Sequence, residues 1–166
     1  MDYSGLSKQA AYERRSKVAG AEIGPIPPVV NQDRKDSCRH DLHRFLVIYF
    51  PNSTGLRPFG QDQIRAIKRI ELCVLSGGRF VQAFPRGFAK TSITECAAIW
   101  SVIYGHRKSV PIFGATDDLA ASNLESIKRE LQENELLAED FPEVCYPIEQ
   151  MEGRPQRCNT QTCAGQ

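Results

Sequence analysis

The stretch that most constrains this chain runs Phe84-Pro85-Arg86-Gly87-Phe88-Ala89-Lys90-Thr91-Ser92. An apolar run, Arg79 to Phe84, leads into it, and a helix-like run, Thr91 to Tyr104, leads out. Strand, tight loop, Lys-Thr and helix is the layout of a phosphate-binding loop. In such a loop, backbone N–H groups surround a polyphosphate and the helix N-terminus adds partial positive charge. The stretch therefore predicts that Lys90 reaches the β- and γ-phosphates of a nucleotide and that the Thr91 hydroxyl binds Mg²⁺.

The match to the common pattern G-x-x-x-x-G-K-[ST] is imperfect. When the pattern is aligned on Lys90, its first glycine falls on Phe84 and its second on Ala89. Only Gly87 then supplies a residue that adopts positive φ without strain. The competing interpretation is a turn in front of an ordinary amphipathic helix, and the flanking strand and helix patterns favour the phosphate site.

Composition excludes several classes of protein. The chain has 166 residues with 41% apolar and 25% charged residues, which is typical of one globular domain with its own core. A net charge of +1 gives no general attraction to nucleic acid or to a membrane surface. No apolar run approaches the roughly 20 residues of a membrane span, and the N-terminus has no signal-peptide pattern, so we expect a cytoplasmic protein without a membrane partner. The six cysteines form no C-x-x-C pair, which argues against the usual zinc sites.

The order of elements predicts an α/β fold with three parts. Residues 1–32 form a polar arm and linker, residues 33–78 a mostly helical lead-in, and residues 79–166 a partial nucleotide-binding core. We expect helices at Asp33–Phe50, Gly60–Leu75, Thr91–Tyr104 and from Thr116-Asp117 to about Leu137, strands at Arg79–Phe84 and Val110–Ala115, and irregular structure from Phe141 to Gln166. Strand, helix, strand, helix in this order implies a parallel sheet with flanking helices, the P-loop NTPase fold. Two strands make an incomplete sheet, so we expect this chain to be the front part of a longer protein.

Several segments together resemble the large subunit of phage terminases. The lead-in residues Pro25 to Val30 and Cys38 to Pro51 are similar to the start of that family, and Gly60 to Ile64 to the segment before its first core strand. The loop Pro85 to Ser92 is similar to its deviant Walker A motif, in which alanine at the second glycine position is compatible with function. The segments Ile112–Ala120 and Ile127–Leu131 resemble the strand and helix that follow.

This resemblance implies the ATP-binding part of a viral DNA-packaging motor, which couples ATP hydrolysis to translocation of double-stranded DNA into a procapsid. It implies Mg-ATP as the cofactor, a portal protein and a small terminase subunit as partners, a homo-oligomeric assembly, and a phage or prophage protein in the host cytoplasm. The predicted nucleotide contacts are Pro85, Arg86, Gly87, Phe88, Ala89, Lys90, Thr91 and Ser92. Lys90 and Arg86 are the predicted catalytic residues, Arg86 as an arginine sensor or finger, and Thr91 is the predicted metal ligand.

Other functions stay open at this point. The sequence has no recognisable Walker B motif, because Asp117-Asp118 is better explained as a helix start, and it has no nuclease acidic cluster. A non-catalytic prophage remnant or binding module, or another motor such as a helicase, is therefore an alternative to an active ATPase. The glutamines Gln61 and Gln63, ahead of the loop, either read adenine or form a polar helix face.

Overall fold

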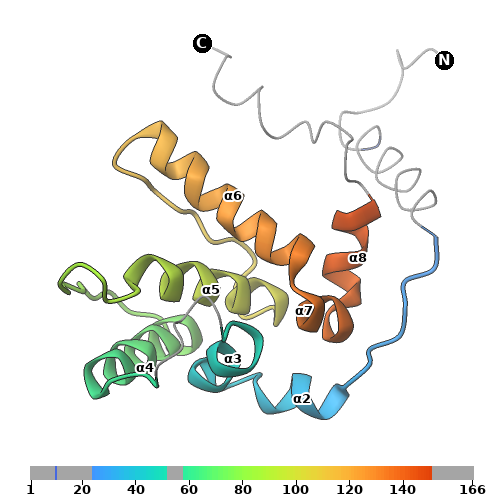
Figure 1. Cartoon of the computed structure of the whole chain (residues 1–166), viewed down its shortest axis with the longest axis horizontal. Coiled ribbons are helices and arrows are strands. Elements are labelled where there is room, and N and C mark those ends of the chain that lie inside the picture. Colours follow the sequence, from blue (N-terminus) through green and yellow to red (C-terminus); the bar gives the residue numbers. More distant parts are fainter. Residues whose placement is uncertain (1–9, 11–23, 52–57, 151–166) are drawn as a thin grey trace.

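The computed structural model describes residue 10 and residues 24–51 and 58–150. Within these ranges the chain is built from helices joined by loops and extended segments (Figure 1). The helices are α2 (Gln32–Ser37), α3 (Leu42–Tyr49), α4 (Gln61–Ser76), α5 (Lys90–Ile103), α6 (Asp117–Glu133), α7 (Glu135–Asp140) and α8 (Pro142–Gln150). α5 packs against α3, α4 and α6, while α7 and α8 close the far end of α6.

The predicted α/β fold is wrong, because the described residues contain no strand. Arg79–Phe84 and Val110–Ala115 are not helical, but no backbone hydrogen bond joins the two segments. The first lies instead along α4, where the Gln82 side-chain amide donates to the carbonyl of Ala66 over 3.3 Å. The outer sides of both segments are open, since Val81 is 90% exposed and Phe113 is 89% exposed. An extended apolar segment becomes a strand only when its backbone pairs with a neighbour, and neither segment has one here.

The predicted helices are largely confirmed, but two of them are each divided in two, and α8 was not expected. α4 and α5 begin and end within one residue of the predicted Gly60–Leu75 and Thr91–Tyr104. The helix expected over Asp33–Phe50 is two helices, because Asp41 caps a new helix by accepting from the Arg44 N–H. The helix expected to reach Leu137 ends at Glu133, because Asn134 caps α7. Part of the segment expected to be irregular forms α8, and residues 151–166 lie outside the described ranges.

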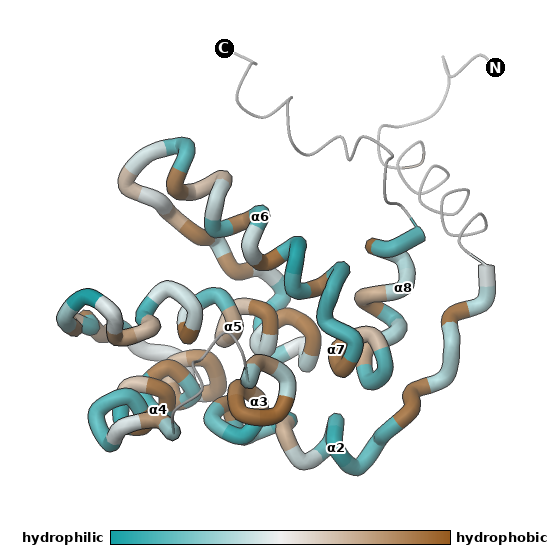
Figure 2. The backbone as a smooth tube through the Cα atoms, viewed as in Figure 1, coloured by the Kyte–Doolittle hydropathy of each residue, from teal (hydrophilic) through white to brown (hydrophobic). Residues whose placement is uncertain are grey.

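The core lies around α3 and the second half of α5. Buried apolar residues from both sides of the predicted boundary at residue 78 meet in one cluster, which includes Leu42, Phe45, Leu46, Tyr49, Phe50, Ile67, Ile93, Cys96, Trp100, Leu137, Phe141 and Cys145. Figure 2 shows apolar residues gathered on α3 and on the part of α5 beside it, with polar residues on the outer sides of α4 and α6. No helix in the described ranges is both long and apolar enough to cross a bilayer.

Two buried hydrogen bonds fix α5 against the segment around α2. The indole N–H of Trp100 donates to the carbonyl of Cys38 over 3.0 Å. The hydroxyl of Tyr104 donates to the carbonyl of Lys35 over 2.6 Å. Both carbonyls belong to the last turn of α2 and the residue after it, and each also accepts a backbone N–H, from Cys38 and Asp41 respectively.

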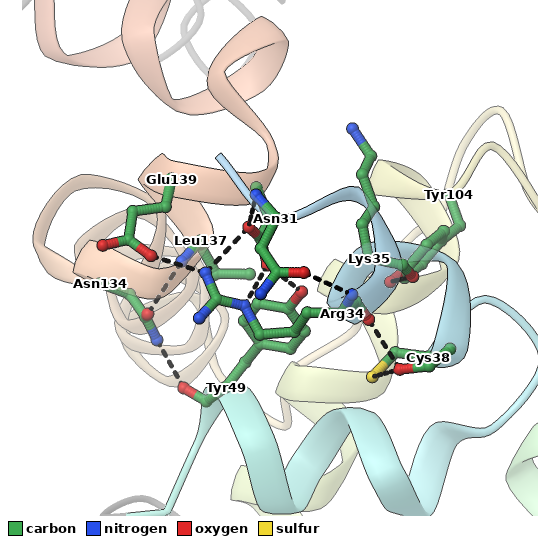
Figure 3. Close-up of polar contacts among 11 residues, drawn as sticks. Asn31, Arg34, Lys35, Cys38, Tyr49, Tyr104, Asn134, Leu137 and Glu139 are labelled. Atoms are coloured by element: carbon green, nitrogen blue, oxygen red, sulfur yellow. Dashed lines mark hydrogen bonds and ion pairs between the residues drawn. The ribbon is translucent and has the colours of Figure 1, made fainter. Parts of the chain in front are cut away.

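A buried carboxylate joins the N-terminal and C-terminal parts of the described chain. Asp140 is fully buried, and its two carboxylate oxygens accept bonds from the Arg34 guanidinium in a bidentate arrangement. The Tyr49 hydroxyl donates to the same carboxylate over 2.6 Å and the Asn31 N–H over 3.2 Å. Figure 3 shows Arg34 of α2 lying between Tyr49 and Glu139, which also accepts from its guanidinium.

Loss of the Asp140 carboxylate should destabilise the fold strongly. We expect Asp140→Ala to lower the free energy of unfolding by about 3 kcal/mol, because it leaves the Arg34 guanidinium and the Tyr49 hydroxyl without their partner. Urea unfolding followed by circular dichroism measures this change. The matched control is Glu139→Ala, since Glu139 also pairs with Arg34 but is exposed, and its loss should cost less than about 1 kcal/mol. Equal effects of the two substitutions would contradict the role of Asp140.

The same carboxylate predicts a dependence of stability on pH. Burial alone would raise the pKa of Asp140, but hydrogen bonds from Arg34 and Tyr49 outweigh burial and lower this pKa below its ordinary value. A group with a lowered pKa in the folded state stabilises the fold fully above the pKa of the unfolded chain, and this stabilisation is lost as the pH falls through the lowered value. Wild type should therefore lose stability on acidification more steeply than Asp140→Asn does, and identical profiles would contradict the prediction. Urea midpoints measured from neutral pH into the acid range test it.

Candidate functional site

The predicted phosphate-binding loop has a left-handed backbone at two positions. Gly87 has φ +81°, and Ala89, the residue before the first turn of α5, has φ +56° and ψ +28°. Ala89 is the one residue other than glycine with positive φ in the described ranges. This conformation costs an L-residue about 1–2 kcal/mol. The alanine at the second glycine position of the pattern thus takes up a conformation that the pattern normally reserves for glycine.

Lys90 folds back over this loop. Its ammonium group donates to the carbonyl of Phe84 over 2.7 Å and to the carbonyl of Pro85 over 3.1 Å. These acceptors are neutral, and no carboxylate in the part of the chain that the structure describes forms an ion pair with Lys90. The charge of Lys90 is therefore held at the loop without being neutralised.

The other predicted site residues lie in the loop or in the first turn of α5, and they differ in exposure. Arg86 and Thr91 are exposed, Arg86 in the turn and Thr91 in the first turn of α5. Ser92 and Phe88 are partly buried, and Pro85 supplies one of the carbonyls that bind Lys90. Within the described ranges Arg86 forms no ion pair.

Gln63 connects the start of α4 to the loop. Its side-chain oxygen accepts from the Gly60 N–H over 2.9 Å, and its side-chain nitrogen donates to the carbonyl of Phe88 over 3.3 Å. Both ends of the amide are occupied in this arrangement, so Gln63 positions the loop. Gln61 is exposed at the first position of α4, which corresponds to the polar helix face considered from the sequence.

A cavity of about 470 Å³ lies between α4 and the segment that leads into the loop. Arg65 and Arg69 of α4 line one side of this cavity, and Phe84 and Phe88 line the other. The two phenylalanine rings are stacked, with centroids 4.4 Å apart and planes inclined by 12°. Sequence reasoning missed this site, although the spacing of Arg65 and Arg69 by four residues already placed both on one side of a helix just before the loop.

The acidic pair Asp117-Asp118 has the structural role expected from the sequence. Thr116 caps α6 by accepting from the Leu119 N–H over 3.3 Å, and both aspartates lie in the first turn. Carboxylates there complement the helix dipole. Among the described residues no group of three or more histidine, cysteine or acidic side chains could hold a metal ion.

No family model, curated protein or solved structure matches this chain.

The left-handed backbone at Ala89 should make this position prefer glycine. We expect Ala89→Gly to leave the free energy of unfolding unchanged or to raise it by up to about 1 kcal/mol, because relief of the strained φ offsets the greater entropy of glycine in the unfolded chain. The matched control is Ala98→Gly inside α5, which should lower the free energy of unfolding by about 1 kcal/mol. Urea unfolding of both variants measures the difference, and equal losses would contradict the strained backbone at Ala89.

Proposed function

We propose that this chain binds the phosphates of Mg-ATP through the loop Pro85–Ser92. The observation that carries this proposal is the position of Lys90, whose charge lies over the loop on two backbone carbonyls and is not neutralised by a carboxylate. A bound phosphate would offer this ammonium group a stronger, charged acceptor in place of neutral ones.

The backbone of the loop supports the same ligand. Left-handed residues in a tight loop gather backbone N–H groups into concavities that bind anions. Gly87 and Ala89 have this conformation directly in front of α5. α5 has 14 residues, and its N-terminus directs the positive end of its dipole at the loop. The strain at Ala89 also fits a functional position, because strained backbone persists most often where a site needs it.

The wider role in this proposal is the ATP-binding part of a DNA-packaging motor. Its support is the ordered set of segments that resemble phage terminase large subunits, from Pro25 through the loop to the helix after Thr116. In such a motor, double-stranded DNA, a portal protein and a small terminase subunit are the partners, and the host cytoplasm is the location. Arg86 is exposed and lies four positions before Lys90. In this proposal it is the arginine that stabilises charge on the transferred phosphoryl group.

A second candidate is nucleotide binding without turnover. It is favoured by the position of Asp117 and Asp118 in the first turn of α6, where complementing the helix dipole explains them without a catalytic function. Phosphoryl transfer to water requires a carboxylate that holds the metal and a group that orients the water, and the sequence has no recognisable Walker B motif to supply them. Release of phosphate from ATP by the chain would exclude this candidate.

Removal of the Lys90 charge should weaken the binding of both ATP and inorganic tripolyphosphate. We expect Lys90→Ala to lower each affinity about tenfold or more, because it removes a charged hydrogen-bond donor from the phosphates. Isothermal titration calorimetry with the full chain measures both ligands. Lys108→Ala, which removes an exposed lysine outside the loop, is the control and should bind as wild type does. If Lys90→Ala and wild type bound tripolyphosphate equally, the loop would not be the phosphate site.

The Thr91 hydroxyl should matter only when Mg²⁺ is present. We expect Thr91→Val to reduce the gain in ATP affinity that Mg²⁺ gives to wild type, and to leave binding in EDTA unchanged, because the hydroxyl would bind the metal and not the phosphates. Thr94→Val is the matched control, since the Thr94 hydroxyl donates to the Lys90 carbonyl within α5. An equal loss of affinity with and without Mg²⁺ would contradict Thr91 as a metal ligand.

A further inference from the structure

The cavity between α4 and the residues before the loop is in direct contact with the proposed phosphate site. Phe84 and Pro85 line the cavity, and their carbonyls are the two groups that bind Lys90. A volume of about 470 Å³ lies within the range of small-molecule pockets, about 300–1,000 Å³. A ligand whose phosphates lie on the loop can therefore extend into this cavity without leaving the protein surface.

One side of the cavity is lined by Phe84 and Phe88, whose backbone is held in place. The two rings stack on each other, so each covers one face of the other and only the outer faces of the pair can receive a ligand. The carbonyl of Phe84 accepts from Lys90, and the carbonyl of Phe88 accepts from Gln63. Aromatic side chains fixed in this way are the surfaces on which nucleic-acid bases stack in proteins.

The α4 side of the cavity carries two arginines, Arg65 and Arg69, and one carboxylate, Asp62. Arg65 forms an exposed ion pair with Asp62 at 3.2 Å. Arg69, one turn further along α4, forms no ion pair within the part of the chain that the structure describes. A guanidinium opposite an aromatic surface suits a planar, electron-rich ring attached to an anion, because it can stack on the ring or donate to its oxygen and nitrogen atoms.

We propose that this cavity holds the base and sugar of the bound nucleotide, with Phe88 as the stacking surface and Arg69 as the charged contact. This inference rests on the proposed phosphate site, because the loop positions the other end of the same ligand. It also gives the site a preference for nucleotides over inorganic polyphosphates, since a polyphosphate leaves the cavity empty.

The test compares ATP with inorganic tripolyphosphate, which carries the phosphates without a base. Calorimetric titrations use the full chain as wild type, Phe88→Leu, Arg69→Gln, Lys90→Ala and the control Arg129→Gln, an exposed arginine of α6 that does not line this cavity. Phe88→Leu should weaken ATP binding about tenfold through loss of stacking, and Arg69→Gln about threefold. Arg69→Gln, which lies outside the loop, should leave the affinity for tripolyphosphate unchanged, and Phe88→Leu should lower it less than it lowers the affinity for ATP. Arg69 is exposed on α4, so its substitution tests the cavity even if Phe88→Leu disturbs the loop.

The outcomes separate this inference from the function on which it rests. A larger loss of affinity for ATP than for tripolyphosphate in both variants, with tripolyphosphate binding retained in Arg69→Gln, supports the base site. Unchanged ATP binding in both variants, or an equal loss for both ligands, overturns the base site but leaves the phosphate site standing if Lys90→Ala weakens both ligands. Binding that is absent in wild type, or that does not respond to Lys90→Ala, overturns the phosphate site itself, and the base site with it.

Discussion

Burial of the second half of α5 fixes the position of the loop that precedes the N-terminus of this helix. Trp100 is fully buried and bonded to the Cys38 carbonyl, and Tyr104 is bonded to the Lys35 carbonyl. Because α5 is a continuous helix of 14 residues, about 20 Å long, anchoring its C-terminal end also sets the position and direction of its N-terminal end. The proposed phosphate site therefore depends on a core that is made largely by α3 and α5 and against which Ala89 of the loop also packs.

The helices could be predicted from the sequence because their signals are local. Apolar residues repeat along α4 with helical spacing, a glycine pair follows it, and Gly105 follows α5 with φ +70°. The predicted sheet was wrong because an apolar run such as Arg79–Phe84 indicates only an extended segment, while pairing into a sheet depends on a neighbour elsewhere in the chain. α8 was missed because its prolines favour irregular structure, although proline is tolerated in the first turn, where Pro142 lies.

In the site, too, features set by neighbouring residues could be predicted, and contacts between residues far apart in the sequence could not. The Lys90-Thr91 pair at the start of a helix could be predicted from its motif, and its position confirms the helix start. The left-handed conformation of Ala89 runs against the preference of alanine, so the sequence argued against it. The contact of Gln63 with Phe88 spans 25 residues, and that of Arg34 with Asp140 spans 106. Helical or strand periodicity does not predict such contacts, and Asp140 lies just after the predicted end of a helix at about Leu137, where nothing in the sequence distinguishes it from the neighbouring acids.

The position of the single tryptophan has a practical consequence for spectroscopy of this chain. Trp100 is the only tryptophan in the sequence, and it contacts the imidazole of His106 with ring centroids 4.6 Å apart. It lies ten residues along α5 from Lys90, which corresponds to about 15 Å of helix. Its intrinsic fluorescence thus reports on the core around α3 and is remote from the loop surface. The emission spectrum separates loss of the fold from events at the loop, within one sample and without an added label.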